Sequence, residues 1–591
     1  MKRTSRAGWS LIAILCIPVF LGSLDLLVVS AFLPDLLREL ALPLDASGQE
    51  AAAWLVNAYL IAYSIALLAI GRLSDLTGWR TALTICLGLY FAGSLLVINY
   101  PVVAGVLSPL YGLLGVARDP AHANLHAIVL ARIIAAFGAG ALASVALSLV
   151  SQAFHAERRA LAVGIIAAMD TIGWMFGGLW GGVVVQFSDW RTVFLVNLPL
   201  IVGTLFLLRR QLRDIEQRRA GGRFDVLGFL LAAGALVAIN LGIARINTDE
   251  AGRLDASGLW LPLLISFGFA AAFIAVEARV KQPLIQLRSL RAPGVPAAHL
   301  INILLGVVLL VALLMIPIFT NVRETGQLGL LIFFSQFTEQ GLRDAALIQG
   351  GLIGAFALPL ALASVLGGGL YERLGGRRTI TLGLIVAAAG TFLFWATISL
   401  TTPYLLIALA AAVAGAGVGI AFTPVIVLLL DAAAESERGA AAALTLSLRM
   451  VAMSITTSFS TAFITQRTVD LVRMMESPNA LLDILPHSQY ATSPFATAYI
   501  AAVNSAIREL FAFSLVLLLV ALGIGRFIRS RTERVAEVTA IPSPLTPSPT
   551  QAGRRGTSCG IPASGGILCP RRPLRRGGEE PGRHRYGSCN P

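Results

Sequence analysis

Long apolar runs separated by short polar stretches extend along most of this chain. Fourteen runs reach the length of about 18–25 residues that a helix needs to cross a hydrocarbon layer. The pattern therefore predicts an all-α integral membrane protein with about fourteen transmembrane helices. The approximate limits of the expected spans are 10–33, 52–71, 80–99, 127–150, 161–186, 191–209, 225–246, 259–277, 295–319, 345–370, 378–400, 404–430, 439–465 and 508–528.

Several stretches do not fit this pattern. Residues 102–116 and 328–337 are apolar but too short to span, and we expect them to form re-entrant or interfacial segments of outside loops. Residues 466–508 are mixed in composition and are expected to form a longer outside loop. The stretch 531–591 is rich in Pro, Arg and Gly. It carries too little apolar surface to offset the entropy of ordering, which predicts a disordered cytoplasmic tail.

One polar pattern, G-x-x-x-[D/E]-x-x-G-x-R, occurs twice, each time between two apolar runs. A hairpin repeated in this way indicates a transporter made of two related halves. The glycines permit a tight turn and a close approach of helices, and the acid can accept hydrogen bonds at a helix N-terminus. The first copy consists of Gly71, Asp75, Gly78 and Arg80, and the second of Gly368, Glu372, Gly375 and Arg377.

Arginine placement predicts the orientation, because cytoplasmic loops of membrane proteins carry an excess of basic residues. The loop at 209–223 alone holds six arginines, and the loops on the opposite side hold far fewer. Both termini are therefore expected in the cytoplasm. The predicted organisation is an N-terminal six-helix bundle (1–210), a linker with two extra transmembrane helices (211–292), a C-terminal six-helix bundle (293–530) and the tail (531–591).

Composition supports the membrane assignment and excludes several function classes. Charged residues make up 13% of the chain, and soluble proteins carry about 25%. The net charge of +13 comes mostly from arginines in short loops and in the tail, so lipid rather than nucleic acid is the expected contact. The two lysines, Lys2 and Lys281, do not lie in a P-loop motif, which argues against an ATPase. No cofactor, metal or catalytic nucleophile motif is evident, so an enzyme is not expected.

Several motifs together resemble the major facilitator superfamily, and within it the fourteen-helix drug:proton antiporter branch. Residues 24–34 look like the first-span pattern L-D-x-T-x-V-N-x-A-L-P of that branch. Residues 54–60, followed by the first hairpin, are similar to its second-span signature. Residues 190–199 look like the entry to its sixth span, and residues 224–228 and 283–288 flank the extra helix pair as in that branch. The resemblance covers roughly residues 10–465 and the last span.

The resemblance implies a role for the repeated hairpin. It would act as a latch that holds the cytoplasmic face shut in one conformation and releases it in the other. The alternative is a static turn whose arginines set the topology.

The chain also departs from the branch. Ala135 and Ala136 stand where a Gln and a Gly are usual, and the proline of the fifth-span signature G-P-x-x-G-G is absent. The thirteenth span keeps Arg449 but lacks the usual glycines. These departures leave the substrate class open.

Three charged residues inside predicted spans are the candidates for proton or substrate coupling. An ionised carboxylate in hydrocarbon is costly, so Asp25 is expected to exchange a proton with a water-filled cavity, unless it is a structural acid. The resemblance implies that Arg132 takes part in proton transfer, with packing as the alternative. Asp170 lies where the family does not usually place an acid. It is predicted to give cation preference, to act as a second proton site or to pair with Arg132.

Five glycines in the fifth span would form a thin helix face that lets helices pack closely. By resemblance, this face would seal the central cavity. Its members are Gly173, Gly177, Gly178, Gly181 and Gly182.

The resemblance implies a secondary active transporter in the inner or plasma membrane. Its expected activity is proton-coupled efflux of amphipathic or drug-like small molecules by alternating access. The expected partners are substrate, protons, the bilayer and, if the envelope has two membranes, a periplasmic adaptor. Uptake or export of a specific metabolite is the alternative. A membrane enzyme or a receptor is not favoured.

Overall fold

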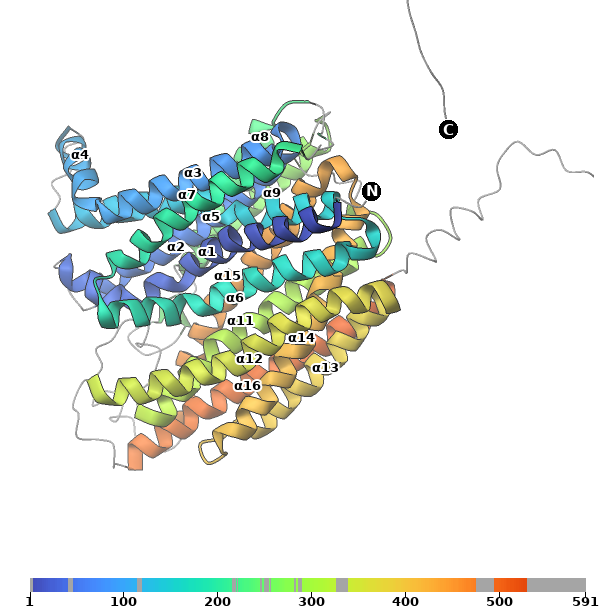
Figure 1. The fold of residues 1–591 in the computed structure, drawn as a ribbon. Coiled ribbons are helices and arrows are strands. Elements are labelled where there is room, and N and C mark those ends of the chain that lie inside the picture. Colours follow the sequence, from blue (N-terminus) through green and yellow to red (C-terminus); the bar gives the residue numbers. More distant parts are fainter. Residues whose placement is uncertain are drawn as a thin grey trace, which may run out of the picture. The chain divides into compact units, whose positions relative to one another are not determined.

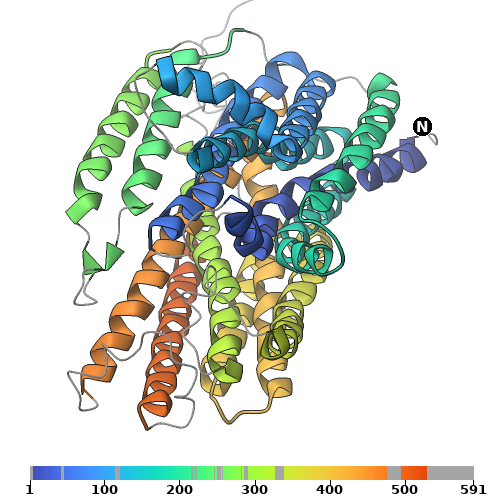
Figure 2. The ribbon, with the colours of Figure 1, turned by 90° about the vertical axis from the view of Figure 1, so that its left-hand side faces the viewer.

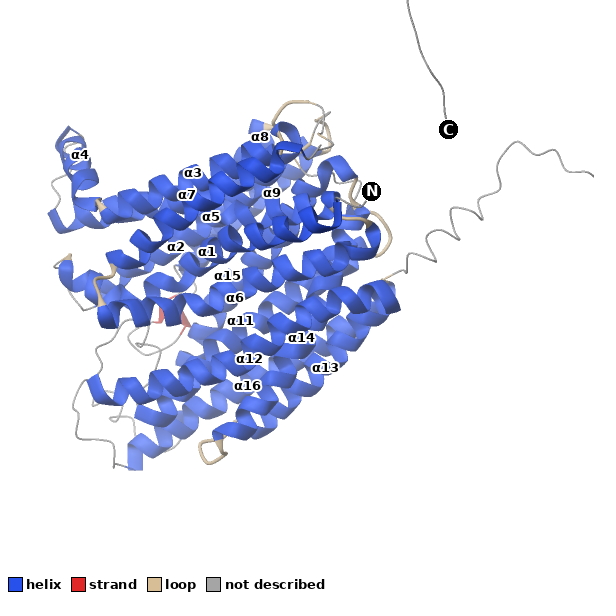
Figure 3. Ribbon diagram, in the orientation of Figure 1, coloured by secondary structure: helices blue, strands red, loops and turns tan. Residues whose placement is uncertain are grey.

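The computed structural model describes residues 4–40, 46–113, 120–214, 219, 222–244, 247–248, 254–255, 257–280, 283–284, 290–325, 339–474 and 494–528. All of them lie within one compact unit, Met1–Ala536. The described residues are helical almost throughout (Figure 3). The predicted tail and the apolar stretch 328–337 fall outside the described residues.

Long helices account for nearly all of this unit. Those of the first half are α1 (Thr4–Glu39), α2 (Ala46–Thr77), α3 (Trp79–Ile98), α4 (Tyr100–Leu113), α5 (Pro120–Ala153), α6 (Ala156–Phe187) and α7 (Arg191–Gln211). A hairpin follows, formed by α8 (Val226–Ala244), the short antiparallel strands β1 (Asn247–Thr248) and β2 (Leu254–Asp255), and α9 (Trp260–Glu277). The second half contains α11 (Val295–Thr325), α12 (Glu339–Leu374), α13 (Gly376–Thr397), α14 (Tyr404–Ala432), α15 (Arg438–Met474) and α16 (Pro494–Ile524).

The predicted fold class is confirmed. Thirteen helices among the described residues are long and apolar enough to cross a membrane, and α8, with 19 residues, supplies a further apolar helix beside them. Helix α4 has 14 residues and includes Pro109, so it is too short to span. It projects from one end of the first half in Figure 1. Val102 and Val106 on this helix are 69% and 65% exposed.

The hydropathy pattern underestimated the length of several helices. The predicted outside loop 466–508 is wrong at both ends, because α15 continues to Met474 and α16 begins at Pro494. Helix α1 similarly continues to Glu39. These extensions carry polar and charged residues, which a search for apolar runs leaves out although the backbone remains helical.

Among the described residues, α1 to α3 with α5 to α7 form one helical bundle, and α11 to α16 form the other (Figures 1 and 2). In the first, α1 packs on α6, and α5 packs on α2 and α3. In the second, α14 packs on α12 and α13, and α11 packs on α15 and α16. The bundles meet chiefly where α6 contacts α12 and where α2 contacts α15, with a smaller contact between α5 and α15. The α8–α9 hairpin lies beside them, and α8 touches both α2 and α15.

Two glycines form equivalent turns in the two bundles. Gly78 separates α2 from α3 with a φ of 102°, and Gly375 separates α12 from α13 with a φ of 81°. L-residues with side chains rarely adopt this left-handed region. The third fixed position of the repeated hairpin is therefore a glycine for the same backbone reason in both copies.

Candidate functional site

The first hairpin joins the two bundles through Asp75, near the end of α2. One carboxylate oxygen of Asp75 accepts a hydrogen bond from the Gly439 amide (2.9 Å), and the other accepts one from the Ala440 amide (2.8 Å). Both amides belong to the first turn of α15, where the helix dipole favours a negative charge. Asp75 is fully buried, and the buried Arg72 adds a positive charge beside it. This carboxylate therefore caps a helix of the opposite bundle.

Close backbone packing surrounds that cap. A Cβ atom built on Gly71 would lie 2.9 Å from the Gly439 carbonyl oxygen and closer still to the Cβ of Ala443. A Cβ built on Gly439 would lie 2.5 Å from an Asp75 carboxylate oxygen. Helices α2 and α15 can approach this closely because these positions lack side chains. Arg80 is exposed at the start of α3.

The second hairpin forms the equivalent contact between α12 and α6. The Glu372 carboxyl faces the backbone of Ala160 and Leu161, near the N-terminus of α6. A Cβ built on Gly368 would lie 2.7 Å from the Ala160 carbonyl carbon and 3.0 Å from the Leu161 Cα. Glu372 is exposed, unlike Asp75, and Arg377 is exposed as well. We call the end of the bundles that carries Asp75 and Glu372 the latch end.

An ion-pair cluster adds to the contact between the bundles at the latch end. The Arg159 guanidinium on α6 bonds to the Asp431 carboxylate on α14 at 2.6 Å. Asp431 also lies 3.9 Å from the guanidinium of Arg438, which donates to the Ser151 carbonyl oxygen at 2.6 Å. These contacts and both hairpins hold the two bundles together at this end. The sequence alone did not predict these contacts of Arg159 and Arg438, because their partners lie far away in the chain.

Asp25 and Arg132 meet inside the first bundle. The Arg132 guanidinium lies 3.7 Å from an Asp25 carboxylate oxygen, and both side chains are at most 1% exposed. Arg132 also donates to the carbonyl oxygens of Leu55 (3.2 Å) and Asp25 (3.3 Å) and lies 4.2 Å above the Tyr59 ring. The Tyr59 hydroxyl faces the Asp25 carboxylate, but it lies outside hydrogen-bonding distance of the carboxylate oxygens. The Arg132 cation is thus held by direct hydrogen bonds, whereas the carboxylate is held mainly by the charge of Arg132.

Asp170 pairs with a residue of the other bundle. Its carboxylate accepts hydrogen bonds from Ser23 (2.6 Å) and from Arg449 on α15 (3.1 Å). The predicted pairing of Asp170 with Arg132 is wrong, because Arg132 is paired with Asp25. Sequence reasoning noted Arg449 as a retained residue but did not include it in the site. Its partner lies 279 positions away, and no local pattern indicates such a pair.

The glycines of the fifth span divide into two groups on α6. Cβ atoms built on Gly173 and Gly177 would fall within 3 Å of the Phe20 and Leu24 carbonyl oxygens, so these two allow α1 to pack closely. Cβ atoms on Gly178 and Gly182 would have no neighbour within 4 Å. Gly181 is buried.

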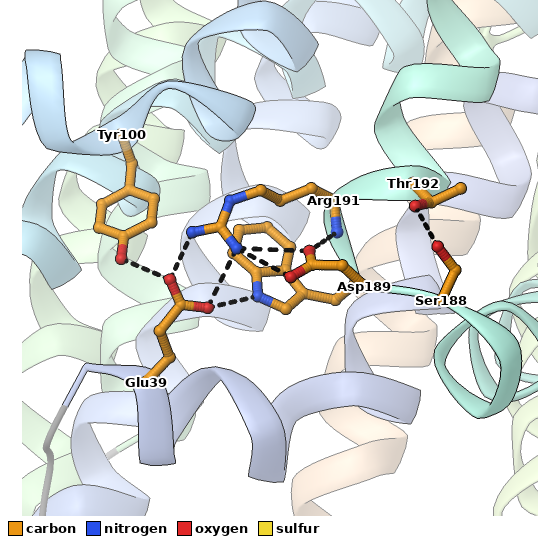
Figure 4. A network of polar contacts seen from close by, with 7 residues as sticks. Glu39, Tyr100, Ser188, Asp189, Arg191 and Thr192 are labelled. Atoms are coloured by element: carbon orange, nitrogen blue, oxygen red, sulfur yellow. Dashed lines mark hydrogen bonds and ion pairs between the residues drawn. The ribbon is translucent and has the colours of Figure 1, made fainter.

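A polar network connects α1, α4 and α7 at the end of the first bundle opposite the latch end, which we call the far end (Figure 4). The Glu39 carboxylate accepts hydrogen bonds from Tyr100 (2.8 Å) and Trp190 (2.7 Å) and forms an ion pair with Arg191. The Arg191 guanidinium also lies 4.5 Å above the Trp190 ring. We infer that the network keeps α1 rigid with its own bundle.

This network predicts a pH dependence of stability. Partial burial raises the pKa of Glu39, but hydrogen bonds from Arg191, Trp190 and Tyr100 outweigh it and leave the pKa below its ordinary value. The stabilisation is therefore complete above the unfolded pKa of about 4.3 and is lost as the pH falls through the lower folded pKa. We expect the difference in melting temperature between wild type and Glu39→Gln to shrink on acidification. A difference that does not change between pH 7 and pH 3 would contradict the assignment.

Comparison with known proteins identifies the family. The Major Facilitator Superfamily model matches residues 15–457. The chain belongs to the major facilitator superfamily. The resemblance inferred from the motifs is thereby confirmed at the level of the superfamily. The family and the fold are those of a multi-pass membrane transporter and not of an enzyme.

Curated relatives are transporters of different compounds. The chain is 28% identical over 396 residues to a triacylglyceride transporter of Mycolicibacterium hassiacum, covering 66% of this chain and 65% of that protein. It is 33% identical over 308 residues to a cephamycin export protein of Amycolatopsis lactamdurans, covering 52% and 57%. The chain therefore spans less than two thirds of the length of either relative.

A solved structure shares the fold of this major facilitator chain. A bacterial homologue of the iron transporter ferroportin matches with a TM-score of 0.52 and 13% identity, over 88% of this chain and 98% of that one.

Proposed function

We propose that this major facilitator chain is a secondary active transporter that couples proton entry to the export of amphipathic small molecules. The two bundles would rock about a central site, alternately closing the latch end and the far end. In this proposal both hairpins, from Gly71 to Arg80 and from Gly368 to Arg377, act as latches. The fourteen-helix drug:proton antiporter branch remains the likeness that suggests export.

The Asp25–Arg132 pair carries the proposal. A buried carboxylate with little hydrogen bonding gains from taking up a proton, because the neutral acid costs far less to bury than the anion. Arg132 is held by two carbonyl oxygens and the Tyr59 ring, so it stays in place when Asp25 is protonated. We assign Asp25 as the proton site and Arg132 as its positioning residue.

Asp170 is assigned a different role. Ser23 and Arg449 occupy its two oxygens, and Arg449 belongs to the opposite bundle. The pair must break when α6 and α15 separate. We assign the Asp170–Arg449 pair as a central gate, and the part of α6 that carries Gly173 and Gly177 as the surface that seals the path against α1.

A carrier for one lipid or metabolite class is the second candidate. The curated relatives favour it, since one is named for triacylglyceride and another for cephamycin. The missing fifth-span proline and the acid at position 170 also distinguish this chain from the general drug-export pattern.

We further propose that the protein resides in the plasma or inner membrane with both termini in the cytoplasm, as the arginine distribution indicates. Protons and a small-molecule substrate are its proposed partners. A periplasmic adaptor would join them only in an envelope with two membranes.

Transport in proteoliposomes tests the proposed function. The full chain is reconstituted, a pH gradient is imposed, and a panel of amphipathic dyes, acylglycerols and polar metabolites is screened for substrate-dependent proton flux. We expect proton flux that appears only with amphipathic compounds. Flux with a single metabolite would favour the second candidate, and substrate movement that ignores the pH gradient would contradict proton coupling.

A further inference from the structure

Arg449 has more hydrogen-bonding capacity than its neighbours use. Its side chain is 1% exposed and lies between the two bundles. One terminal nitrogen, Nη2, donates to Asp170. The Nε and Nη1 atoms are buried and have no acceptor among the described residues. Buried N–H groups without acceptors are costly, so this side chain presents donor positions that a bound molecule can fill.

The partner of Arg449 already receives two donors. One Asp170 oxygen accepts a hydrogen bond from Ser23 and the other accepts one from Arg449. The Arg449 cation also balances the charge of Asp170, so a cationic ligand would leave one net positive charge in this buried site, which argues against the hypothesis that Asp170 gives cation preference.

Charge balance further restricts the chemical class of the ligand. One guanidinium and one carboxylate give a neutral pair, and an uncharged ligand leaves it neutral. A carboxylate ligand would leave one net negative charge in a low-dielectric site, which is unfavourable. An uncharged oxygen acceptor satisfies the free donors without adding charge.

Aromatic rings supply the apolar part of the site. The Arg449 guanidinium lies 4.3 Å from the centre of the Phe422 ring on α14 and 5.4 Å from that of Trp174 on α6. Gly306 on α11 leaves room for the Arg449 side chain, since a Cβ there would lie 2.9 Å from its Cγ. Donors from one bundle and aromatic surface from both therefore converge at one point between the bundles.

We infer that Arg449 binds an uncharged carbonyl oxygen of the substrate, as in an ester or amide, while its apolar part packs on Phe422 and Trp174. The inference rests on the proposed transport function and names its substrate class. Binding adds contacts to α15 and α6 at the gate, so the substrate would stabilise the state in which the bundles are close together around it.

A matched ligand series tests the inference on the wild-type protein. Four fluorescent amphiphiles share one tail and differ in one group, which is a methyl ester, a hydrocarbon isostere of it, a carboxylate or a quaternary ammonium. We expect the ester to have the lowest KM in proteoliposomes, about tenfold below the isostere, as for a hydrogen bond to a charged donor. Equal KM values for ester and isostere, or a preference for either charged compound, would overturn the inference.

Variants then assign the preference to one side chain. The double variant Asp170→Asn/Arg449→Met removes both charges together and should lose the ester preference. Arg467→Met removes another arginine of α15, one that pairs with Glu509, and should keep it. Monodisperse elution and an unchanged melting temperature establish that each variant folds. If the folded double variant keeps the wild-type preference, Arg449 is not the binding residue.

Failure of the inference is distinguishable from failure of the proposed function. Ligand binding is measured separately, by equilibrium dialysis of the detergent-purified wild type without a pH gradient. Ester-selective binding without any proton-coupled transport would contradict the proposed function and support the binding site. Proton-coupled transport without ester selectivity would support the proposed function and contradict the binding site.

Discussion

Substitution of Gly368 by leucine should disfavour closure of the latch end and strongly reduce transport. The new Cβ would lie 2.7 Å from the Ala160 carbonyl carbon, and a helix backbone cannot move aside as a flexible side chain can. Overpacking costs about 1–3 kcal/mol. A penalty of that size lowers the population of the closed state by roughly 5- to 150-fold.

The neighbouring residue provides the control. A Cβ on Gly369 would meet nothing within 4 Å, so Gly369→Leu should leave transport unchanged. Spin labels at Arg80→Cys and Arg377→Cys, in a cysteine-free background, report the separation of the bundles at the latch end. We expect a longer distance in Gly368→Leu and the wild-type distance in Gly369→Leu. Identical distances in both variants would mean that Gly368 does not limit the approach of α6 and α12.

Replacement of Asp25 by asparagine should abolish the response of transport to a pH gradient. The amide does not titrate in the relevant range, so no proton would be carried at this position. The single variant also leaves the Arg132 cation without its carboxylate. Breaking a buried pair in this way costs about 3–5 kcal/mol, so reduced stability alone would lower activity.

A charge-balanced variant separates the two effects. Asp25→Asn/Arg132→Gln removes both charges and should regain stability relative to Asp25→Asn. Substrate counterflow, which needs no gradient, should persist in the folded double variant, while accumulation driven by a pH gradient should be lost. Gradient-driven accumulation at the wild-type level would show that the proton is carried elsewhere.

The fold followed largely from the sequence. The apolar runs predicted the positions of the spanning helices. The repeated glycines predicted the turns, because Gly78 and Gly375 adopt backbone conformations that residues with side chains rarely adopt. Helix ends were less accurate. Residues such as Glu39 continue a helix past the apolar region, where backbone hydrogen bonding and tertiary contacts, rather than hydropathy, determine the end.

The candidate site was only partly accessible to sequence reasoning. A charge within an apolar span is conspicuous, so Asp25, Arg132 and Asp170 could be named. Their pairing could not be predicted, because it depends on how helices distant in sequence pack, within one bundle for Asp25 and Arg132 and between the bundles for Asp170. Arg449 reaches Asp170 across that interface, and Arg159 reaches Asp431 in the same way.

The two copies of the hairpin differ in how water reaches them. Glu372 is already solvated in the closed state, whereas Asp75 is not. Releasing Glu372 from the start of α6 therefore exposes little additional charge at that hairpin, but releasing Asp75 from α15 requires hydration of a carboxylate and of the amides that it caps. We expect the two hairpins to open in sequence, with a fast, easily reversed release of Glu372 followed by a slower release of Asp75.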